Sequence, residues 1–441
     1  MKRRNFLKKT ALTAASTIVA PYILPAGRLF APTGARVANH VVFMLFAGGI
    51  RQQESVDQQY LANQGLPTEG NLMLNMLEGA QPSNNLLFNL WSPVSQPLTQ
   101  SGTLFKEVEY KTGPTGHYNG HTVAMTGNYT ETGLNLNINP EYPTVFEYYR
   151  KHSDPTKSAL NAWWISEGLG PYPSLNYSRD PLYGSQYGAN YLRPASLFGN
   201  AGNQFANAIT YQPDDVQRIN KIKGLLDSNF HNTADDLPGI QNTPENRELI
   251  KNFILDLQDQ GQNGTLEVAT PGNNYNLLTG DLINISAAWQ VLDEFSPELT
   301  VINSTNLDVC HDNFSSYLNF LHRADYGIGW LWNKIQSHPV LANDTILICM
   351  PEHGRNLDSN NLADQNGLGA YDHTGDTNSR RVFTLIVGPS DKIKQGQVLG
   401  SLGSPAAESI DVIPTIAHIL GFNDDIPFNS LPGRVLTEAF V

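Results

Sequence analysis

Short apolar runs that alternate with helix-like stretches constrain the fold of this chain more than any other feature. The first run, His40 to Phe46 (HVVFMLF), ends in Ala47-Gly48-Gly49, the pattern of a buried strand that enters a tight turn. Further apolar runs lie at 159–165, 299–303, 345–350 and 382–387. Helix-like stretches lie between them at 144–152, 282–295, 314–335 and 409–420. This alternation predicts an α/β fold with a mostly parallel central sheet and helices on both faces.

The length of the chain and one change in its composition predict the domain organisation. With 441 residues, of which 40% are hydrophobic, the chain can bury a large core in one domain, which we place at 39–441. The stretch from about 168 to 280 differs because it is rich in Asn, Gln, Gly, Pro and Tyr, with a polar helical stretch near 244–260. We interpret it as an inserted cap segment and as a surface for a protein partner.

The first residues of the chain resemble a twin-arginine export signal. Arg3 and Arg4 precede Phe6-Leu7-Lys8, and a mildly apolar stretch rich in Ala and Thr follows. We therefore predict that 1–38 is a signal and linker, and that the mature protein is periplasmic or otherwise exported by this route. Prolines interrupt the apolar stretch, which is short for a membrane span of about 20 residues. No later stretch is a better candidate, so we expect no transmembrane span in the mature chain.

Charge and cysteine content exclude several classes of function. The chain has a net charge of −13, and its first 31 residues hold six basic residues and no acidic one. A mature body this acidic is repelled by phosphate backbones, so we expect no nucleic acid partner. Only Cys310 and Cys349 are present, which excludes a disulfide scaffold and a thiolate-rich zinc finger. A single bridge between the two remains open.

Polar clusters follow three of the predicted strands directly. They lie at 306–314 (NLDVCHDNF), 351–356 (PEHGRN) and 371–374 (YDHT). Because ligands of parallel sheets gather at the carboxyl ends of the strands, we expect these clusters to meet at one edge. Mixed imidazole and carboxylate side chains are ligands of Zn²⁺ and similar cations, so the sequence predicts a divalent metal site there.

The order of these clusters resembles the alkaline phosphatase and sulfatase superfamily. Asp308 and His311 match the Asp and His that this superfamily uses for one metal, and His373 matches its late His. Glu352-His353-Gly354 matches the Asp-His-Gly turn that holds a second metal, and 409–416 resembles the last helix. The resemblance implies an alkaline phosphatase-like fold with these metal ligands: Asp308, His311, Glu352, His353 and His373.

Two positions depart from the pattern of active members. Ala47 stands where the first strand normally ends in an Asp ligand. Counting nine residues back from Thr126-Gly127 to the usual nucleophile gives His117, with Thr115 as the neighbouring alternative. These departures resemble a divergent, uncharacterised branch of exported proteins with a twin-arginine signal, a Gly-Gly turn and a Glu-x-Gly-Arg motif, here Glu352 to Arg355.

The resemblance implies a metal-dependent hydrolase of phosphate or sulfate esters, with an altered metal site and an anionic small-molecule or glycan substrate. Under this hypothesis His117, or else Thr115, acts as general base or phosphoryl acceptor, and Arg355 holds an anionic group. The alternative is a non-catalytic exported protein that keeps the fold for binding or assembly. Phosphomutase-like chemistry on the same scaffold is a third alternative, which needs the same nucleophile.

Overall fold

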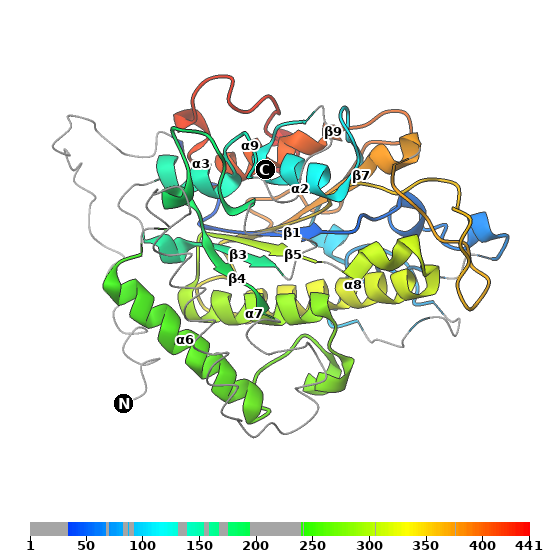
Figure 1. Ribbon diagram of the computed structural model, residues 1–441, viewed down its shortest axis with the longest axis horizontal. Coiled ribbons are helices and arrows are strands. Elements are labelled where there is room, and N and C mark those ends of the chain that lie inside the picture. The colour runs from blue at the N-terminus through cyan, green and yellow to red at the C-terminus, as the bar shows by residue number, and fades with distance from the viewer. Residues whose placement is uncertain are drawn as a thin grey trace.

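A computed structural model gives the fold of the protein (Figure 1). It describes residues 34–67, 70–82, 87, 92–130, 139–153, 158–166, 175–194, 240, 242–304, 306–374 and 376–441. The predicted export signal therefore lies outside the described residues, apart from its last few positions. Much of the predicted cap segment, including 195–239, also lies outside them.

A single nine-stranded sheet organises the described chain, in the order β4-β3-β5-β1-β6-β7-β2-β8, with β9 also paired to β2. The strands are β1 (His40–Phe46), β2 (Gly102–Glu109), β3 (Ala162–Ser166), β4 (Asn190–Leu192), β5 (Leu299–Asn303), β6 (Thr345–Pro351), β7 (Arg381–Val387), β8 (Gln397–Leu399) and β9 (Ala407–Glu408). All pairings are parallel except those of β7 with β6 and with β2. The predicted α/β class and mostly parallel sheet are confirmed.

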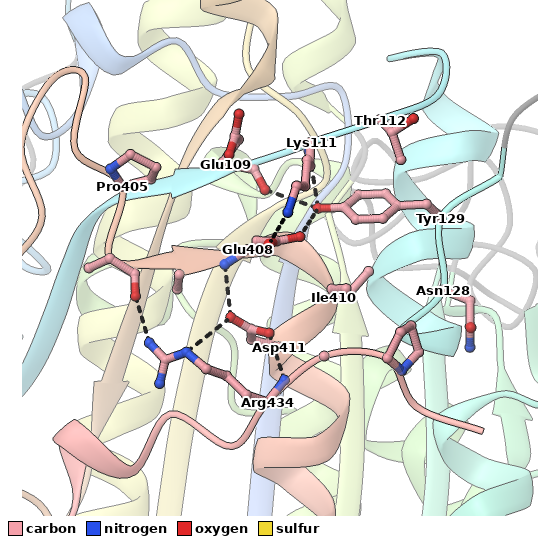
Figure 2. Close-up of a pocket in the computed structure, with 14 residues that line it drawn as sticks. Glu109, Lys111, Thr112, Asn128, Tyr129, Pro405, Glu408, Ile410, Asp411 and Arg434 are labelled. Carbon is pink, nitrogen blue, oxygen red and sulfur yellow. Dashed lines mark hydrogen bonds and ion pairs between the residues drawn. The ribbon is translucent and has the colours of Figure 1, made fainter. Parts of the chain in front are cut away.

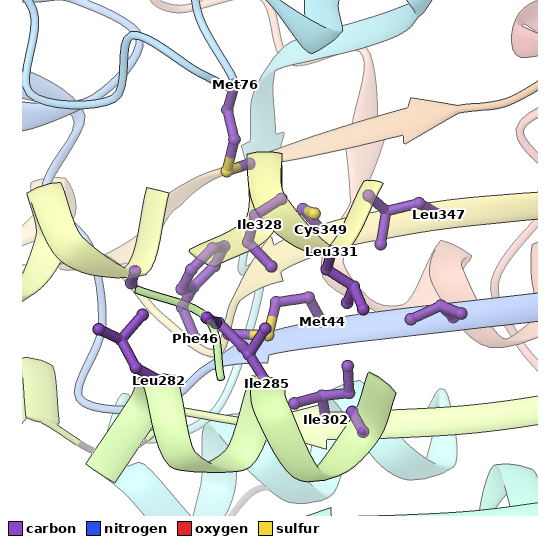
Figure 3. Close-up of a cluster of buried hydrophobic side chains, with 14 of the residues drawn as sticks. Met44, Phe46, Met76, Leu282, Ile285, Ile302, Ile328, Leu331, Leu347 and Cys349 are labelled. Carbon is purple, nitrogen blue, oxygen red and sulfur yellow. The ribbon is translucent and has the colours of Figure 1, made fainter. Parts of the chain in front are cut away.

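Helices cover both faces of the sheet, as the alternation of elements predicts (Figure 1). One face carries α2 (His117–Thr126), α3 (Val145–His152) and α9 (Val412–Ile419), and the other carries α6 (Pro244–Gln262), α7 (Gly280–Phe295) and α8 (Phe314–Ser337). Successive residues of a strand point to opposite faces. Thus Met44 and Phe46 of β1 pack with α7 and α8 (Figure 3), whereas Phe43 and Leu45 join the core beneath α2, α3 and α9.

The structure adds elements to the predicted ones and confirms a helix, α6, at the predicted polar helical stretch near 244–260. The strand β2 was not predicted, and it lies near the sheet edge next to β7. The described part of the stretch 168–280 contributes β4, which extends the sheet beside β3, and α6, whose apolar side chains join the core under α7. This part of the stretch therefore packs against the main domain.

Two further findings concern membranes and thiols. Among the helices of the described residues, none combines the length and the apolar character needed to cross a bilayer.

Cys310 and Cys349 are both buried free thiols, and burial raises the pKa of Cys310 to about 12. Both side chains belong to the core between the sheet and α8, so they act as small apolar groups there.

We predict that Asp325 of α8 is needed for stability. It is buried, and its carboxylate accepts hydrogen bonds from Asn75 N, Asn75 Nδ2 and Met76 N, each at 2.8 Å. Asparagine offers a single acceptor oxygen and turns an amide toward a backbone donor, so Asp325→Asn should cost about 1–3 kcal/mol. Urea denaturation measures this loss, and the exposed Asp391→Asn serves as the matched control. Equal stability of the two variants would contradict the role assigned to Asp325.

Candidate metal centre

The carboxyl ends of three adjacent strands, β5, β1 and β6, bring the predicted site residues together. After β1, Gly48 and Gly49 turn with φ angles of 90° and 72°, which favour glycine. A Cβ atom on Gly48 would lie 2.2 Å from Asp308 N, and one on Gly49 would lie 2.4 Å from His353 Nδ1. The glycine pair thus lets the turns after β5 and β6 approach the end of β1.

Four side chains, His117, Asp308, His311 and His373, form what we call the edge cluster. Their candidate ligand atoms all lie within 4.8 Å of one another. Asp308 Oδ1 lies 2.7 Å from His117 Nε2 and 3.2 Å from His311 Nε2. The ring centroids of His117 and His373 are 4.3 Å apart. Because the side chains of His117, Asp308 and His311 are 20%, 27% and 29% exposed, a small molecule can reach the cluster.

Each imidazole of the edge cluster has a hydrogen-bond partner at Nδ1. His117 Nδ1 lies 2.8 Å from Glu352 Oε1, and His311 Nδ1 lies 2.6 Å from Asp372 Oδ1. His373 Nδ1 donates to the carbonyl oxygen of Thr115 at 2.6 Å. These partners fix the orientation of the three rings.

Glu352, His353 and His121 form an inner group behind the edge cluster. The side chains of Glu352 and His353 are fully buried. Glu352 Oε1 accepts a hydrogen bond from Gly48 N at 2.6 Å and lies 3.3 Å from His353 Nε2, while Glu352 Oε2 contacts His121 Nδ1. The remaining ring nitrogen of His121 lies 2.9 Å from Asn303 Oδ1, at the end of β5.

The charges of the two groups shift several pKa values. Burial lowers the pKa of His117, but Glu352 and Asp308 outweigh burial and raise it to about 9. Burial raises the pKa of Glu352, yet the rings of His121, His353 and His117 hold it well below its usual value. For His373, burial and then the charge of His353 lower the pKa. At neutral pH Glu352 is therefore ionised and His373 is neutral, whereas a cation bound by His117 would have to displace a proton from it.

Arg355 and Thr115 lie at the site but engage neighbouring backbone groups. The Arg355 side chain is fully buried, and it donates to the carbonyl oxygens of Gly48, Leu307 and Tyr371 and to Asp308 Oδ1 at 3.2 Å. Its guanidinium thus joins the segments that follow β1 and β5 to the segment before His373. Thr115 Oγ1 donates to the carbonyl oxygen of His373 at 2.5 Å. Both side chains hold the site together in this geometry.

Two residues of the site were not predicted from the sequence: the carboxylate of Asp372 and the side-chain amide of Asn303. Asp372 pairs with His311, and the signal available was its place beside His373 in the third polar cluster. Asn303 faces His121, and its place as the last residue of β5 could have indicated that contact. His121 itself lies one helical turn after His117, so both rings reach the same region.

A separate open pocket lies at the other end of α2 (Figure 2), lined by residues of β2, β9 and the chain near 432–434. Lys111 Nζ is paired with Glu408 Oε1 at 2.8 Å, and Arg434 Nε lies 3.9 Å from Asp411 Oδ2. These charged groups engage one another. We therefore place the candidate functional site at the edge cluster.

Comparisons with known proteins find no matching family model and no matching curated protein. Solved structures do match. A protein in the alkaline phosphatase superfamily from Vibrio parahaemolyticus is 12% identical, with 99% of this chain and 79% of that chain covered and a TM-score of 0.45. The phosphonate monoester hydrolase from Silicibacter pomeroyi is 14% identical, with 90% and 76% covered and a TM-score of 0.41. Wild-type alkaline phosphatase PafA is 12% identical, with 92% and 99% covered and a TM-score of 0.43.

At these identities and TM-scores the matches describe general architecture and carry no information about substrate or individual residues. The sheet order, the helices on both faces and the edge cluster come from the chain's own structure. The mostly parallel sheet and the convergence of Asp308, His311 and His373 are what the sequence motifs predict.

Proposed function

We propose that the protein is a metal-dependent hydrolase of anionic esters, with phosphate and sulfate esters as its substrate class. The observation that carries the proposal is the edge cluster: three imidazoles and one carboxylate converge where the side chains are partly exposed. Asp308, His311 and His373 are the residues that would hold a divalent cation. Their imidazole and carboxylate donors suit Zn²⁺.

The site fits a cation because its imidazole and carboxylate donors converge within 4.8 Å of one another. Asp308 Oδ1 faces ring nitrogens of both His117 and His311, so one small cation between them would contact all three side chains. Such a cation would supply positive charge that neutralises an anionic ester and polarises its oxygen. The protein's own contribution is orientation: Asp372 and the Thr115 carbonyl hold the rings of His311 and His373.

A specific observation favours the alternative, a non-catalytic binding protein. The edge cluster offers four side chains, which is the number found in closed structural zinc sites, whereas catalytic zinc sites usually keep three protein ligands and one open position. The hydroxyl of Thr115 is also engaged with His373. Turnover measurements decide between the two functions.

Protein loaded with zinc should therefore hydrolyse at least one member of a panel of aryl phosphates, phosphodiesters and sulfate esters. Removal of the cation with a chelator should abolish that activity and lower the melting temperature, because a cation held only by the native state stabilises it. The His311→Ala and His373→Ala variants should have neither the zinc-dependent activity nor the change in melting temperature when the chelator is added. A metal-loaded protein that cleaves no ester of the panel would favour the binding protein.

We also propose that the protein is exported through the twin-arginine route, on the strength of Arg3 and Arg4 before Phe6-Leu7-Lys8. Changing both arginines to lysine should leave the full-length precursor in the cytoplasm. Cell fractionation and immunoblotting of the wild-type chain and the double variant test this. Undiminished export of the double variant would refute the route.

A further inference from the structure

We propose that the edge cluster holds one cation with His117 as its fourth ligand, and that Glu352 positions this histidine instead of binding a second cation. This inference rests on the proposed metal site and deepens it. It assigns to His117 the role of a ligand, where the sequence pattern places a nucleophile. It also means that the Glu352-His353 turn orients His117 and does not bind a cation of its own.

The first observation is which ring nitrogen of each histidine in the edge cluster carries a proton. A carbonyl oxygen only accepts, so the bond from His373 Nδ1 to Thr115 O places the proton on Nδ1 and leaves Nε2 free of it. At His117 and His311, the carboxylates of Glu352 and Asp372 hold Nδ1, while Nε2 faces the carboxylate of Asp308, so a cation would take the place of the proton between Nε2 and Asp308. In all three rings, Nε2 is therefore the nitrogen left to face a shared cation position.

The second observation is that His117 and His311 lie at similar distances from one oxygen of Asp308. His117 Nε2 and His311 Nε2 lie 2.7 Å and 3.2 Å from the same oxygen, Asp308 Oδ1. Ligand bonds of about 2.0–2.1 Å put neighbouring ligands of a tetrahedral zinc site about 3.3 Å apart. His117 is therefore as close to a shared cation position as His311, which the sequence motif identifies as a ligand.

The third observation is that one oxygen of the inner group's carboxylate, Glu352 Oε1, already has two hydrogen-bond partners. Glu352 Oε1 accepts from Gly48 N at 2.6 Å and from His117 Nδ1, while Oε2 contacts His121. His353 Nδ1 donates to the carbonyl oxygen of Gly354 at 2.6 Å. Ala47 adds no carboxylate at the end of β1. The ligand atoms of His117, Glu352 and His353 also lie within 4.8 Å of one another, but a second cation among them would have to displace the two hydrogen bonds at Glu352 Oε1.

Glu352 and His117 then form the arrangement in which a carboxylate holds the outer nitrogen of a metal-binding histidine. Asp372 and His311 repeat it on the other side of the edge cluster. Glu352 is thus a positioning residue. Its loss should weaken cation binding by about 10- to 100-fold, the effect typical of such outer partners.

The test uses the purified full chain with Zn²⁺. Mass spectrometric metal analysis should give one zinc per chain, and competition with a chromophoric chelator should give an affinity that falls about 10- to 100-fold in Glu352→Gln. His117→Gln should lower the affinity further and alter the visible spectrum of Co²⁺ bound in place of zinc. Glu408→Gln, in the separate pocket, is the control and should leave the affinity unchanged.

The outcomes separate this inference from the proposed function. Two zinc ions per chain, or an unchanged affinity in Glu352→Gln, would overturn the inference and leave the hydrolase proposal standing. One zinc per chain with the expected losses, but without ester hydrolysis, would support the inference and overturn the hydrolase proposal. Failure of the wild-type chain to bind zinc would overturn both.

Discussion

Replacing His117 with alanine should lower ester hydrolysis whichever role it has: by on the order of 100- to 10,000-fold as a general base, or, as a metal ligand, by weakening the hold on the cation. His117 contacts Asp308 in the edge cluster and Glu352 in the inner group, so its loss removes the link between them. The measurement is kcat and KM of the zinc-loaded variant on the best ester of the panel.

Excess zinc separates the two roles of His117. If the histidine is a ligand, high zinc concentrations should restore part of the activity of His117→Ala, whereas a lost general base is not restored. The comparison variant is Thr115→Val, which removes the hydrogen bond from Thr115 Oγ1 to the His373 carbonyl and should cause a smaller loss. Collapse of activity in Thr115→Val alone would show that Thr115, and not His117, occupies the place of the nucleophile.

Arg51→Met should destabilise the protein by about 3–5 kcal/mol, the cost of leaving one member of a buried ion pair without its partner. The Arg51 and Glu54 side chains are both buried, and Nε and Nη2 of Arg51 donate to the two carboxylate oxygens at 2.7 Å and 2.6 Å. The Arg51 guanidinium also lies 3.6 Å from the ring centre of Tyr371, next to Asp372 and His373. Its loss should therefore also loosen the edge cluster.

The double variant Arg51→Met with Glu54→Leu provides the control. It removes both charges, and replacement of a whole buried pair by apolar residues is often nearly neutral. Most of the lost stability should therefore return, as measured by urea denaturation of metal-free protein. A loss below about 1 kcal/mol for Arg51→Met alone would contradict the argument that the pair is desolvated.

The elements that the sequence predicts well are those whose burial is visible in their own residues. The ends of β1 and β5 match the predicted runs, and β6 differs by one residue, because strands buried on both faces are continuously apolar. The strand β2 (GTLFKEVE) carries charges in its second half. Glu107 is buried there because Arg381 of β7 pairs with it, and so distant a partner leaves no local signal.

In the candidate site, too, some features could be predicted from the sequence and others could not. The convergence of Asp308, His353 and His373 follows from where strands end, which the sequence indicates. The partners of Arg355 follow from the paths of three turns, so its engagement with backbone carbonyls could not be predicted. Its charge and its fork of donors suggested an anion contact, whereas in the structure its two Nη atoms donate to acceptors of the protein itself.

The antiparallel direction of β7 has a consequence for how such a protein can diversify. Because β7 runs against β6, its beginning lies beside the end of β6, so the chain leaves the sheet at Pro351 and returns at Arg381 on the same side. A single excursion thus supplies Glu352 near its start and His373 near its end, while much of 357–367 between them is exposed. Insertions or deletions at the exposed positions of that stretch can change the surface there while the two anchored ends keep their positions, provided that Asn360, which bonds to His311 and Asp372, is kept. A library that varies only this stretch therefore tests whether it influences substrate choice under the proposed function.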